Sequence, residues 1–248
     1  MAMVSNAVWY DLHCHVLPGI DDGCKTSVES VQILRESKKQ GIGGIIATPH
    51  YYPRESVGEF LERRNRSVQQ LERQMQAELD EPPRICYGAE VAYHAGLVYE
   101  EDLHLLCLGQ SCYLLLELPF SQWPSAILRD IYTLNGLGIT PIIAHIERYL
   151  KLQPTRMIQM LLDSDVLIQM NAEALLGGWK SRNARRMLYK GQIHVLGSDC
   201  HNLVSRPQNL GGTAARLAGG SLGQALEAVR QRNERIFFEA FLVREEAK

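Results

Sequence analysis

The sequence predicts an α/β fold, a single-domain, distorted, seven-stranded (β/α)7 barrel. About seven short apolar runs are each followed by a helical pattern or a loop. Runs that are apolar throughout are typical of strands covered on both faces, as in a parallel sheet. The length of 248 residues fits one domain of this class, because α/β barrels reach this size without splitting, so residues 1–248 are expected to form one domain.

The elements can be placed in order along the chain. A capping-box spacing at 26–29 opens a helix that stops near Gly41, and a longer helix covers about 56–79. Ser125 is expected to cap a helix that reaches Asn135. Further helices follow Pro154, cover 183–190 and close the chain as a pair. The expected strands occupy residues 8–10, 44–48, 85–87, 113–116, 141–144, 166–170 and 194–197.

Composition limits the kinds of partner and compartment that are expected for this protein. The net charge of −2 gives no reason to expect nucleic acid, and no apolar stretch approaches the ~18 residues that span a bilayer. The N-terminus lacks the basic and apolar regions of a signal peptide, so a cytoplasmic protein without membrane insertion is expected. The six cysteines form no CxxC pair and are expected to be free thiols. An oligomer is compatible with the sequence.

The main functional signal is that six of the expected strands lead into histidines or carboxylates. A single histidine after a strand is usually a surface or packing residue. The carboxyl ends of barrel strands converge on one face, however, so six such ends predict a shared metal site. These residues are His13, His15, His50, Glu90, Glu117, His145, Asp199 and His201.

Spacing within the strand ends supports this interpretation. His13 and His15 are two residues apart, so both side chains point to the same side of a strand while Cys14 points to the other. Asp199 and His201 repeat that spacing. The loop 21–23, Asp-Asp-Gly, could be a plain turn, but with so many ligands nearby we expect one of its two aspartates to coordinate a metal.

The donors outnumber the four to six ligands of a single cation, which predicts two or three metals. Imidazole and carboxylate donors without thiolate suit Mn²⁺, Fe or Zn²⁺. Paired divalent metals ~3.5–4 Å apart lower the pKa of a bound water and stabilise an in-line displacement at phosphorus. The sequence has no P-loop motif, which argues against nucleotide-driven transfer.

Two arginines follow these ligands in loops on the metal face. Arg148 comes three residues after His145, and Arg206 comes five residues after His201. Each could bind phosphate oxygens through its planar guanidinium, or could form an ordinary surface ion pair. Glu147 could be a further ligand or could orient one.

Taken together, the sequence motifs around these residues resemble those of the polymerase-and-histidinol-phosphatase (PHP) superfamily. Within it, the chain is similar to the bacterial manganese-dependent protein-tyrosine phosphatases of capsule and exopolysaccharide operons, the CpsB/YwqE type. The resemblance spans nearly the whole chain. The H-x-H and D-x-H motifs mark the superfamily, and the other strings are more specific to the phosphatases. The resemblance is carried by DLHCH at 11–15, IDDG at 20–23, ATPH at 47–50, YGAE at 87–90, AHIERY at 144–149 and SDCHN at 198–202.

The resemblance implies a PHP/TIM-like barrel with a trinuclear manganese centre. One metal would take His13, His15, Glu90 and Asp199; a second would share Glu90 and add Glu117 and His145; the third would take Asp22, His50 and His201. Arg148 and Arg206 would bind the phosphoryl group. The implied substrates are phosphotyrosines on the tail of a partner kinase that controls polysaccharide export. Cys24 and Cys14 depart from the usual family residues without touching a ligand.

Three alternatives compete with this hypothesis. Cys200 and Arg206 have the C-x5-R spacing of cysteine-dependent tyrosine phosphatases, but the intervening residues include no glycine to let amides converge on phosphate. A small phosphate ester such as histidinol phosphate would need the same metal centre. A non-enzymatic binding module would require lost ligands, and every expected position is filled.

Overall fold

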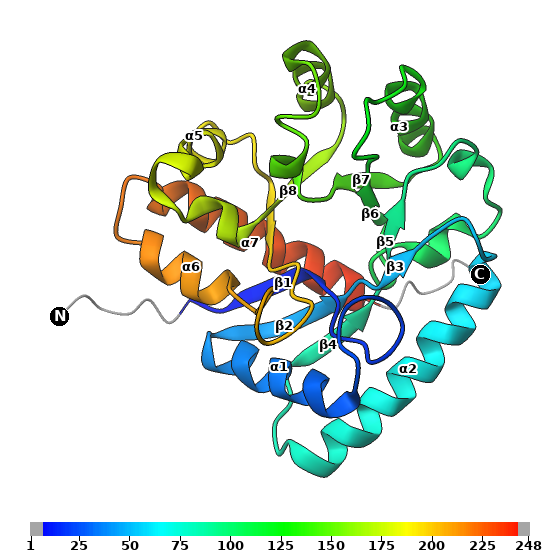
Figure 1. Cartoon of the computed structure of the whole chain (residues 1–248), viewed down its shortest axis with the longest axis vertical. Helices are drawn as coiled ribbons and strands as arrows, with labels where there is room; N and C mark the ends of the chain where they lie inside the picture. The colour runs from blue at the N-terminus through cyan, green and yellow to red at the C-terminus, as the bar shows by residue number, and fades with distance from the viewer. Residues whose placement is uncertain (1–6, 243–248) are drawn as a thin grey trace.

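The computed structural model describes residues 7–242 as a curled parallel sheet surrounded by helices (Figure 1). Every paired strand runs parallel to its neighbour, which confirms the α/β class. One sheet has the order β1-β2-β4 and the other β3-β5-β6-β7-β8-β9. The strands are β1 (Trp9–Cys14), β2 (Ile42–Ala47), β3 (His50–Tyr51), β4 (Arg84–Tyr87), β5 (Glu90–Ala92), β6 (Tyr113–Glu117), β7 (Thr140–Ile143), β8 (Leu167–Asn171) and β9 (Val195–Gly197).

Two breaks divide the sheet into its two parts. Thr48 and Pro49 separate β2 from β3, and Gly88 and Ala89 separate β4 from β5. Proline has no backbone N–H to continue a ladder. Single hydrogen bonds still cross the breaks, from Gly88 N to the Ala47 carbonyl at 2.9 Å and from Glu90 N to the Pro49 carbonyl at 3.0 Å. The sequence predicted seven strands, whereas nine strands are present in the described residues.

The first and last strands approach each other. A parallel bridge joins Cys14 to Cys200, just after β9, and His15 N donates to the Cys200 carbonyl at 2.9 Å. Asp199 N donates to the His13 carbonyl at 2.8 Å. The sheet therefore curls far enough to bring the residues that follow β1 beside those that follow β9.

Helices cover the outside of this curled sheet (Figure 1). They are α1 (Ser27–Lys39), α2 (Val57–Glu78), α3 (Ala126–Gly136), α4 (Thr155–Leu162), α5 (Arg182–Tyr189), α6 (Leu210–Leu217) and α7 (Gly223–Phe241). Short 3-10 helices are η1 (Leu97–Tyr99), η2 (Leu103–Leu106), η3 (Ile146–Arg148), η4 (Ala172–Leu175) and η5 (Gly178–Ser181). Among the described helices, none combines the length and hydropathy that a bilayer-spanning segment requires.

The three helices α1, α2 and α3 begin where the sequence predicted, but only two of them have a side-chain cap bond. Ser56 and Glu59 form the complete reciprocal capping box of α2. Thr26 accepts from Glu29 N at 3.2 Å, although the Glu29 carboxylate binds Lys25 N instead of Thr26 N. The prediction for Ser125 was wrong: its φ of −58° and ψ of −21° are already helical, and its side chain makes no cap bond. An N-cap needs extended backbone to turn its side chain toward the first free amides.

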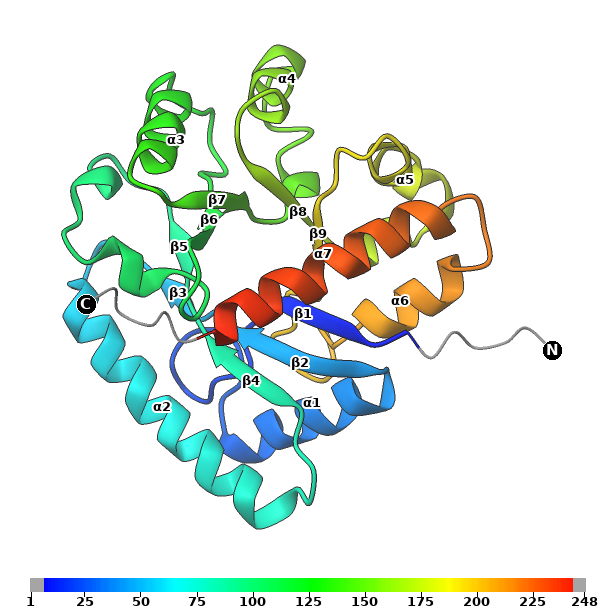
Figure 2. The ribbon, with the colours of Figure 1, turned by 180° about the vertical axis from the view of Figure 1, so that it is seen from behind.

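The helix α7 closes the concave side of the sheet. Figure 2 shows it crossing in front of the strands, whereas it lies behind them in Figure 1. Its Ile236, Phe237 and Ala240 form one buried cluster with side chains from six strands, including Tyr10 and Leu12 of β1. A Cβ on Gly44 would come within 2.2 Å of the Phe237 ring, so this close approach requires glycine. A second cluster fills the space between the sheet and the outer helices, so both faces of the strands are buried.

Candidate metal centre

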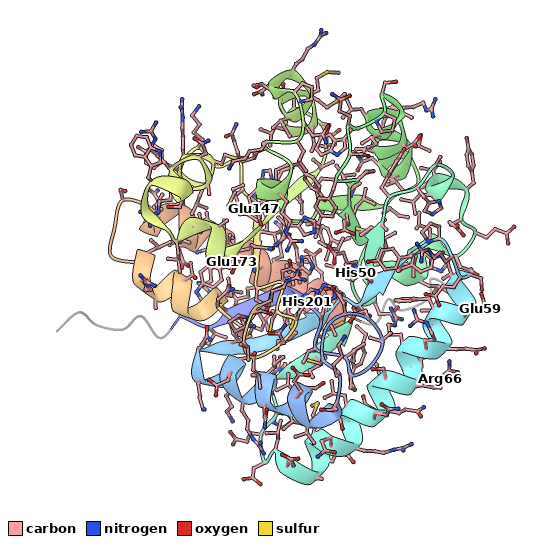
Figure 3. The ribbon with its side chains drawn as sticks, viewed as in Figure 1. His50, Glu59, Arg66, Glu147, Glu173 and His201 are labelled. Atoms are coloured by element: carbon pink, nitrogen blue, oxygen red, sulfur yellow. The ribbon has the colours of Figure 1, made fainter. Side chains whose placement is uncertain are left out.

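The nine expected donor side chains gather on one face of the molecule, where the strands of the curled sheet end or are interrupted. In Figure 3, His50 and His201 lie together near the centre of that face, although they come from β3 and from the segment after β9. Three groups of donors each place one atom per residue within 4.8 Å of one another. The groups are His13, His15, Glu90 and Asp199; His50, Glu90 and Glu117; and His15, Asp22, His50 and His201.

The first group has the spacing of a metal coordination shell. Glu90 Oε2 lies 3.2 Å from His13 Nε2 and 3.1 Å from His15 Nε2. Asp199 Oδ1 lies 3.4 and 3.5 Å from the same two nitrogens. Neighbouring donors that are each ~2.1 Å from a cation are ~3–3.5 Å apart in octahedral or tetrahedral geometry. All four side chains are at least 98% buried, so their polar atoms face one another and not solvent.

Glu90 also reaches the second group with its other oxygen. Its Oε1 lies 3.0 Å from His145 Nε2, which is itself 3.3 Å from Glu117 Oε1. Its Oε2 is 3.2 Å from His50 Nδ1. One carboxylate therefore contacts four imidazoles through two oxygens, which is the arrangement of a ligand that bridges cations.

The two aspartates of the loop after β1 have different positions. Asp22 Oδ1 lies 3.3 Å from His201 Nε2 and 3.5 Å from His50 Nε2, which places it in the third group. Asp21 Oδ2 instead contacts His15 Nδ1 at 2.8 Å and accepts from His50 N at 3.0 Å. The expectation that one of this pair faces the metal donors therefore falls on Asp22, while Asp21 orients His15.

Buried nitrogens and oxygens in this cluster lack hydrogen-bond partners within residues 7–242. They are His50 Nδ1, His145 Nδ1, His201 Nε2 and Asp199 Oδ1. Unpaired buried polar atoms are rare because each loses its hydration without compensation. Three of them, His50 Nδ1, His201 Nε2 and Asp199 Oδ1, face other donors, which fits divalent cations because these take lone pairs and need no hydrogen.

The charges of the cluster are strongly coupled. Burial opposes ionisation of Glu90, but contact with His13 and its hydrogen bonds to histidines hold its pKa well below the usual range. Burial also acts against the protonated form of His145, yet hydrogen bonds to Glu117 and Glu90 raise its pKa to about 9. Burial and the charge of His15 lower the pKa of His201 to about 4. The Glu90 carboxylate thus stays ionised and attracts cationic charge to the site.

Two donors have unusual backbone conformations. His145 has a φ of 33° and Asp199 a φ of 52°, and they are the positive-φ residues other than glycine among those described. Such conformations cost about 1–3 kcal/mol and persist where the surrounding structure enforces them. Both residues stand at the point where a strand turns its side chain into the donor cluster.

The two arginines meet at one oxygen. Arg148 Nη2 lies 2.5 Å and Arg206 Nη2 lies 2.6 Å from Asp199 Oδ2. About a third of each arginine side chain is exposed. They are thus paired with a donor of the cluster and not with ordinary surface carboxylates, and both guanidiniums reach the edge of the metal site.

A neutral network that the sequence did not assign supports these donors. Gln169 Oε1 lies 3.3 Å from His13 Nδ1 and accepts from His145 N at 2.5 Å. Its Nε2 donates to Asn171 Oδ1 at 2.9 Å, and Asn171 Nδ2 donates to Asp199 Oδ2 at 2.8 Å. A proton on His13 Nδ1 leaves the Nε2 lone pair facing the carboxylates. One feature of the sequence could have pointed to this network: the expected strand 166–170 leads into Asn171, as other expected strands lead into donor residues.

Two further carboxylates, those of Asp11 and Glu147, have structural roles. Asp11 is fully buried and accepts from Ser198 Oγ at 2.6 Å and Gln208 Nε2 at 2.8 Å, which ties β1 to the segment after β9. Burial raises the pKa of Asp11. Glu147, for which the sequence left two roles open, accepts from Asn171 N at 3.3 Å, and burial raises its pKa to about 7. Glu147 therefore contacts Asn171, a member of the neutral network that supports the donors.

The loop after Cys200 is unlike a cysteine-phosphatase loop. The amides of Val204, Ser205 and Arg206 all point to Asn202 Oδ1, at 2.9, 2.7 and 3.3 Å. They therefore converge on a side chain and not on an anion position. Cys200 is fully buried, with its sulfur 3.8 Å from the Asn202 carbonyl. Cys14, Cys24, Cys86, Cys112 and Cys200 are free thiols, as the sequence predicted.

Comparisons with known proteins agree with this geometry. A family model described as capsular polysaccharide synthesis, CpsB/CapC, matches residues 9–235. The tyrosine-protein phosphatase YwqE of Bacillus subtilis is 31% identical over 203 residues, which are 79% of this chain and 78% of that protein. The tyrosine-protein phosphatase CpsB of Streptococcus pneumoniae is 32% identical over 207 residues, 79% of this chain and 84% of that one.

A solved structure extends the similarity to the fold. It comes from a study of YwqE from Bacillus subtilis and CpsB from Streptococcus pneumoniae, described as unique metal-dependent tyrosine phosphatases. The TM-score is 0.80 at 25% sequence identity, and the alignment covers 93% of this chain and 94% of the other. The same curled α/β architecture is therefore present in both.

Proposed function

Because the chain belongs to the CpsB/CapC family of capsular polysaccharide synthesis proteins, we propose that it is a metal-dependent protein-tyrosine phosphatase. The observation that carries this proposal is the position of Asp199. Its Oδ1 lies within 3.5 Å of the His13 and His15 nitrogens, and its Oδ2 accepts from Arg148 and Arg206. A cation-binding cluster and two phosphate-binding groups thus share one residue, as a phosphoryl group held by both would require.

The proposed ligand sets share only the bridging Glu90. One metal would take His13, His15, Glu90 and Asp199, a second Glu90, Glu117 and His145, and the third Asp22, His50 and His201. Mixed imidazole and carboxylate donors suit manganese, with iron or zinc as alternatives. When bound, two or three such metals would supply a water of lowered pKa and neutralise phosphoryl charge. The ligands are His13, His15, Asp22, His50, Glu90, Glu117, His145, Asp199 and His201.

Arg148 and Arg206 bind the non-bridging phosphoryl oxygens in this proposal. Both side chains already reach Asp199 Oδ2, so a phosphoryl oxygen at that edge takes over an existing charged contact. Water adds to phosphorus, the bond from phosphorus to the tyrosine oxygen breaks, and the products are inorganic phosphate and tyrosine. The phenolate oxygen that leaves takes up a proton.

The finer architecture is part of the same proposal. If β2 with β3, and β4 with β5, each count as one interrupted strand, the order around the sheet has seven positions, and the bridge from Cys14 to Cys200 closes it. We propose this distorted (β/α)7 barrel for residues 1–248 as a single domain. The proposed substrate is phosphotyrosine on a bacterial tyrosine kinase that controls polysaccharide synthesis, in the cytoplasm.

The test compares substrates after chelation and single-metal reconstitution. Chelated protein should lose turnover of a phosphotyrosine peptide, and Mn²⁺ should restore it. Histidinol phosphate, assayed in parallel, distinguishes a small-molecule phosphatase, which would turn it over faster than the peptide. Full activity in excess chelator, with no metal found by elemental analysis, would contradict the metal-dependent mechanism.

A further inference from the structure

Two aromatic rings are half-exposed at the edge of the donor cluster. Tyr52 is 44% exposed and stacks on the His50 ring, with 5.2 Å between centroids. Phe120 is 49% exposed and stacks on the His145 ring at 5.8 Å. Each ring therefore covers a histidine of the site with one face and leaves part of its apolar surface open beside a carboxylate-rich cluster.

The Phe120 ring is held by a packed aromatic group. It lies 5.6 Å from the ring of Tyr149, which lies 5.3 Å from the ring of Trp123. Leu118 N donates to the Tyr149 hydroxyl at 3.0 Å, and Trp123 Nε1 donates to the Pro119 carbonyl at 2.9 Å. The loop that carries Phe120 is thus fixed at both ends, so the ring is placed before any ligand binds.

The strands that lead to the two rings are two positions apart in the sheet. Tyr52 follows β3 and Phe120 follows β6, and β5, which begins with Glu90, lies between those strands. Adjacent strands are ~4.8 Å apart, so the strands that lead to the two rings are ~10 Å apart. Stacked aromatic centroids are ~4.5–7 Å apart, so a third ring fits between two that are ~9–14 Å apart.

We propose that Tyr52 and Phe120 bind the phenyl ring of phosphotyrosine and give the site its preference for aryl over alkyl phosphates. The inference rests on the proposed function. In an aryl phosphate only the ester oxygen separates phosphorus from the ring. A phosphoryl group at the donor cluster therefore leaves the ring at the edge where Tyr52 and Phe120 are open. An alkyl phosphate places no ring there and gains no stacking.

The experiment measures dissociation constants of phenylphosphonate and methylphosphonate for the manganese-loaded protein. In Phe120→Leu and Tyr52→Leu, the preference for phenyl over methyl should fall by ~10-fold, the scale of one lost aromatic contact. Phe120→Tyr should keep the preference. The KM for a phosphotyrosine peptide should rise in the leucine variants more than kcat falls.

The matched control is Tyr132→Leu, which removes a 79% exposed ring from α3. It should leave the phosphonate preference unchanged. A preference within ~2-fold of the original in both leucine variants would overturn the inference. If Tyr52→Leu loses metal because His50 shifts, the phosphonate preference of Phe120→Leu alone tests the inference. Binding of both phosphonates without phosphotyrosine hydrolysis would count against the proposed function only, and binding of neither would count against both.

Discussion

The donor cluster has two halves that hold their histidines by different means. The seam, where β1 meets the segment after β9, consists of His13, His15, Asp199 and His201. The arc consists of His50 and Glu90, which begin β3 and β5, Glu117, which ends β6, and His145, which follows β7. In the seam, each imidazole Nδ1 contacts an oxygen, from Gln169, Asp21 or the Asp199 carbonyl. In the arc, each imidazole stacks on an aromatic ring.

This difference has a physical consequence. A polar contact at Nδ1 fixes the tautomer and directs the Nε2 lone pair, which suits a permanent ligand of a cation. Ring stacking fixes the plane of an imidazole and brings apolar surface to the site. Exposure differs in part, because seam side chains are at most 2% exposed whereas Glu117 and His50 of the arc are 13% and 10% exposed, although Glu90 and His145 are buried at 1%. The seam is therefore expected to control metal retention, and the arc to meet the substrate.

The largest effect is expected in the seam. His13→Ala removes a nitrogen that lies within 3.4 Å of both Glu90 and Asp199, so a cation there loses a main ligand. We expect turnover of phosphotyrosine peptide to fall by ~10³-fold or more and bound metal to decrease. Elemental analysis and kcat/KM measure the two effects. His104→Ala, on an exposed histidine, is the control, and an active His13→Ala with full metal content would contradict the ligand assignment.

The arginines are expected to act on the substrate and not on the metals. Arg148→Ala or Arg206→Ala should lower kcat/KM by ~10²-fold or more, the scale of one lost charged donor to the transition state. Metal content should stay unchanged. Lysine at either position should rescue only in part, because an ammonium lacks the planar fork. Exposed Arg156→Ala is the control, and near-normal rates in both alanine variants would make these arginines surface residues.

The sequence singled out the side chains that gather in the donor cluster but not the network behind them, for a physical reason. Charged and imidazole side chains at strand ends have one obvious common role, and parallel strands must end on one face. Gln169 is a neutral residue inside an apolar strand, and its contacts depend on His13 and His145, which are distant in sequence. The breaks in the sheet at 48–49 and 88–89 likewise depend on the pairing between strands.

Gln169 offers the sharpest test of the seam. Gln169→Leu keeps the volume but removes the oxygen beside His13 Nδ1 and the acceptor for His145 N. We expect metal affinity to fall by ~10–100-fold, with activity recovered in excess Mn²⁺ because the ligands remain. Titration with Mn²⁺ measures the shift, and Gln76→Leu on the exposed side of α2 should cause none. Unchanged metal affinity in Gln169→Leu would show that this network does not support metal binding.

The smallest effect is expected at Cys200, which lies in the seam but faces away from the donors. Its thiol is fully buried beside the Asn202 carbonyl, and the loop amides that would bind an anion in a cysteine phosphatase all point to Asn202 Oδ1. Cys200→Ser keeps the shape of the side chain and should retain most activity, as should the control Cys112→Ser. Kinetics and intact-protein mass spectrometry measure the outcome. A trapped phosphocysteine, or a loss of ~10³-fold in Cys200→Ser with metals still bound, would assign the nucleophile to sulfur.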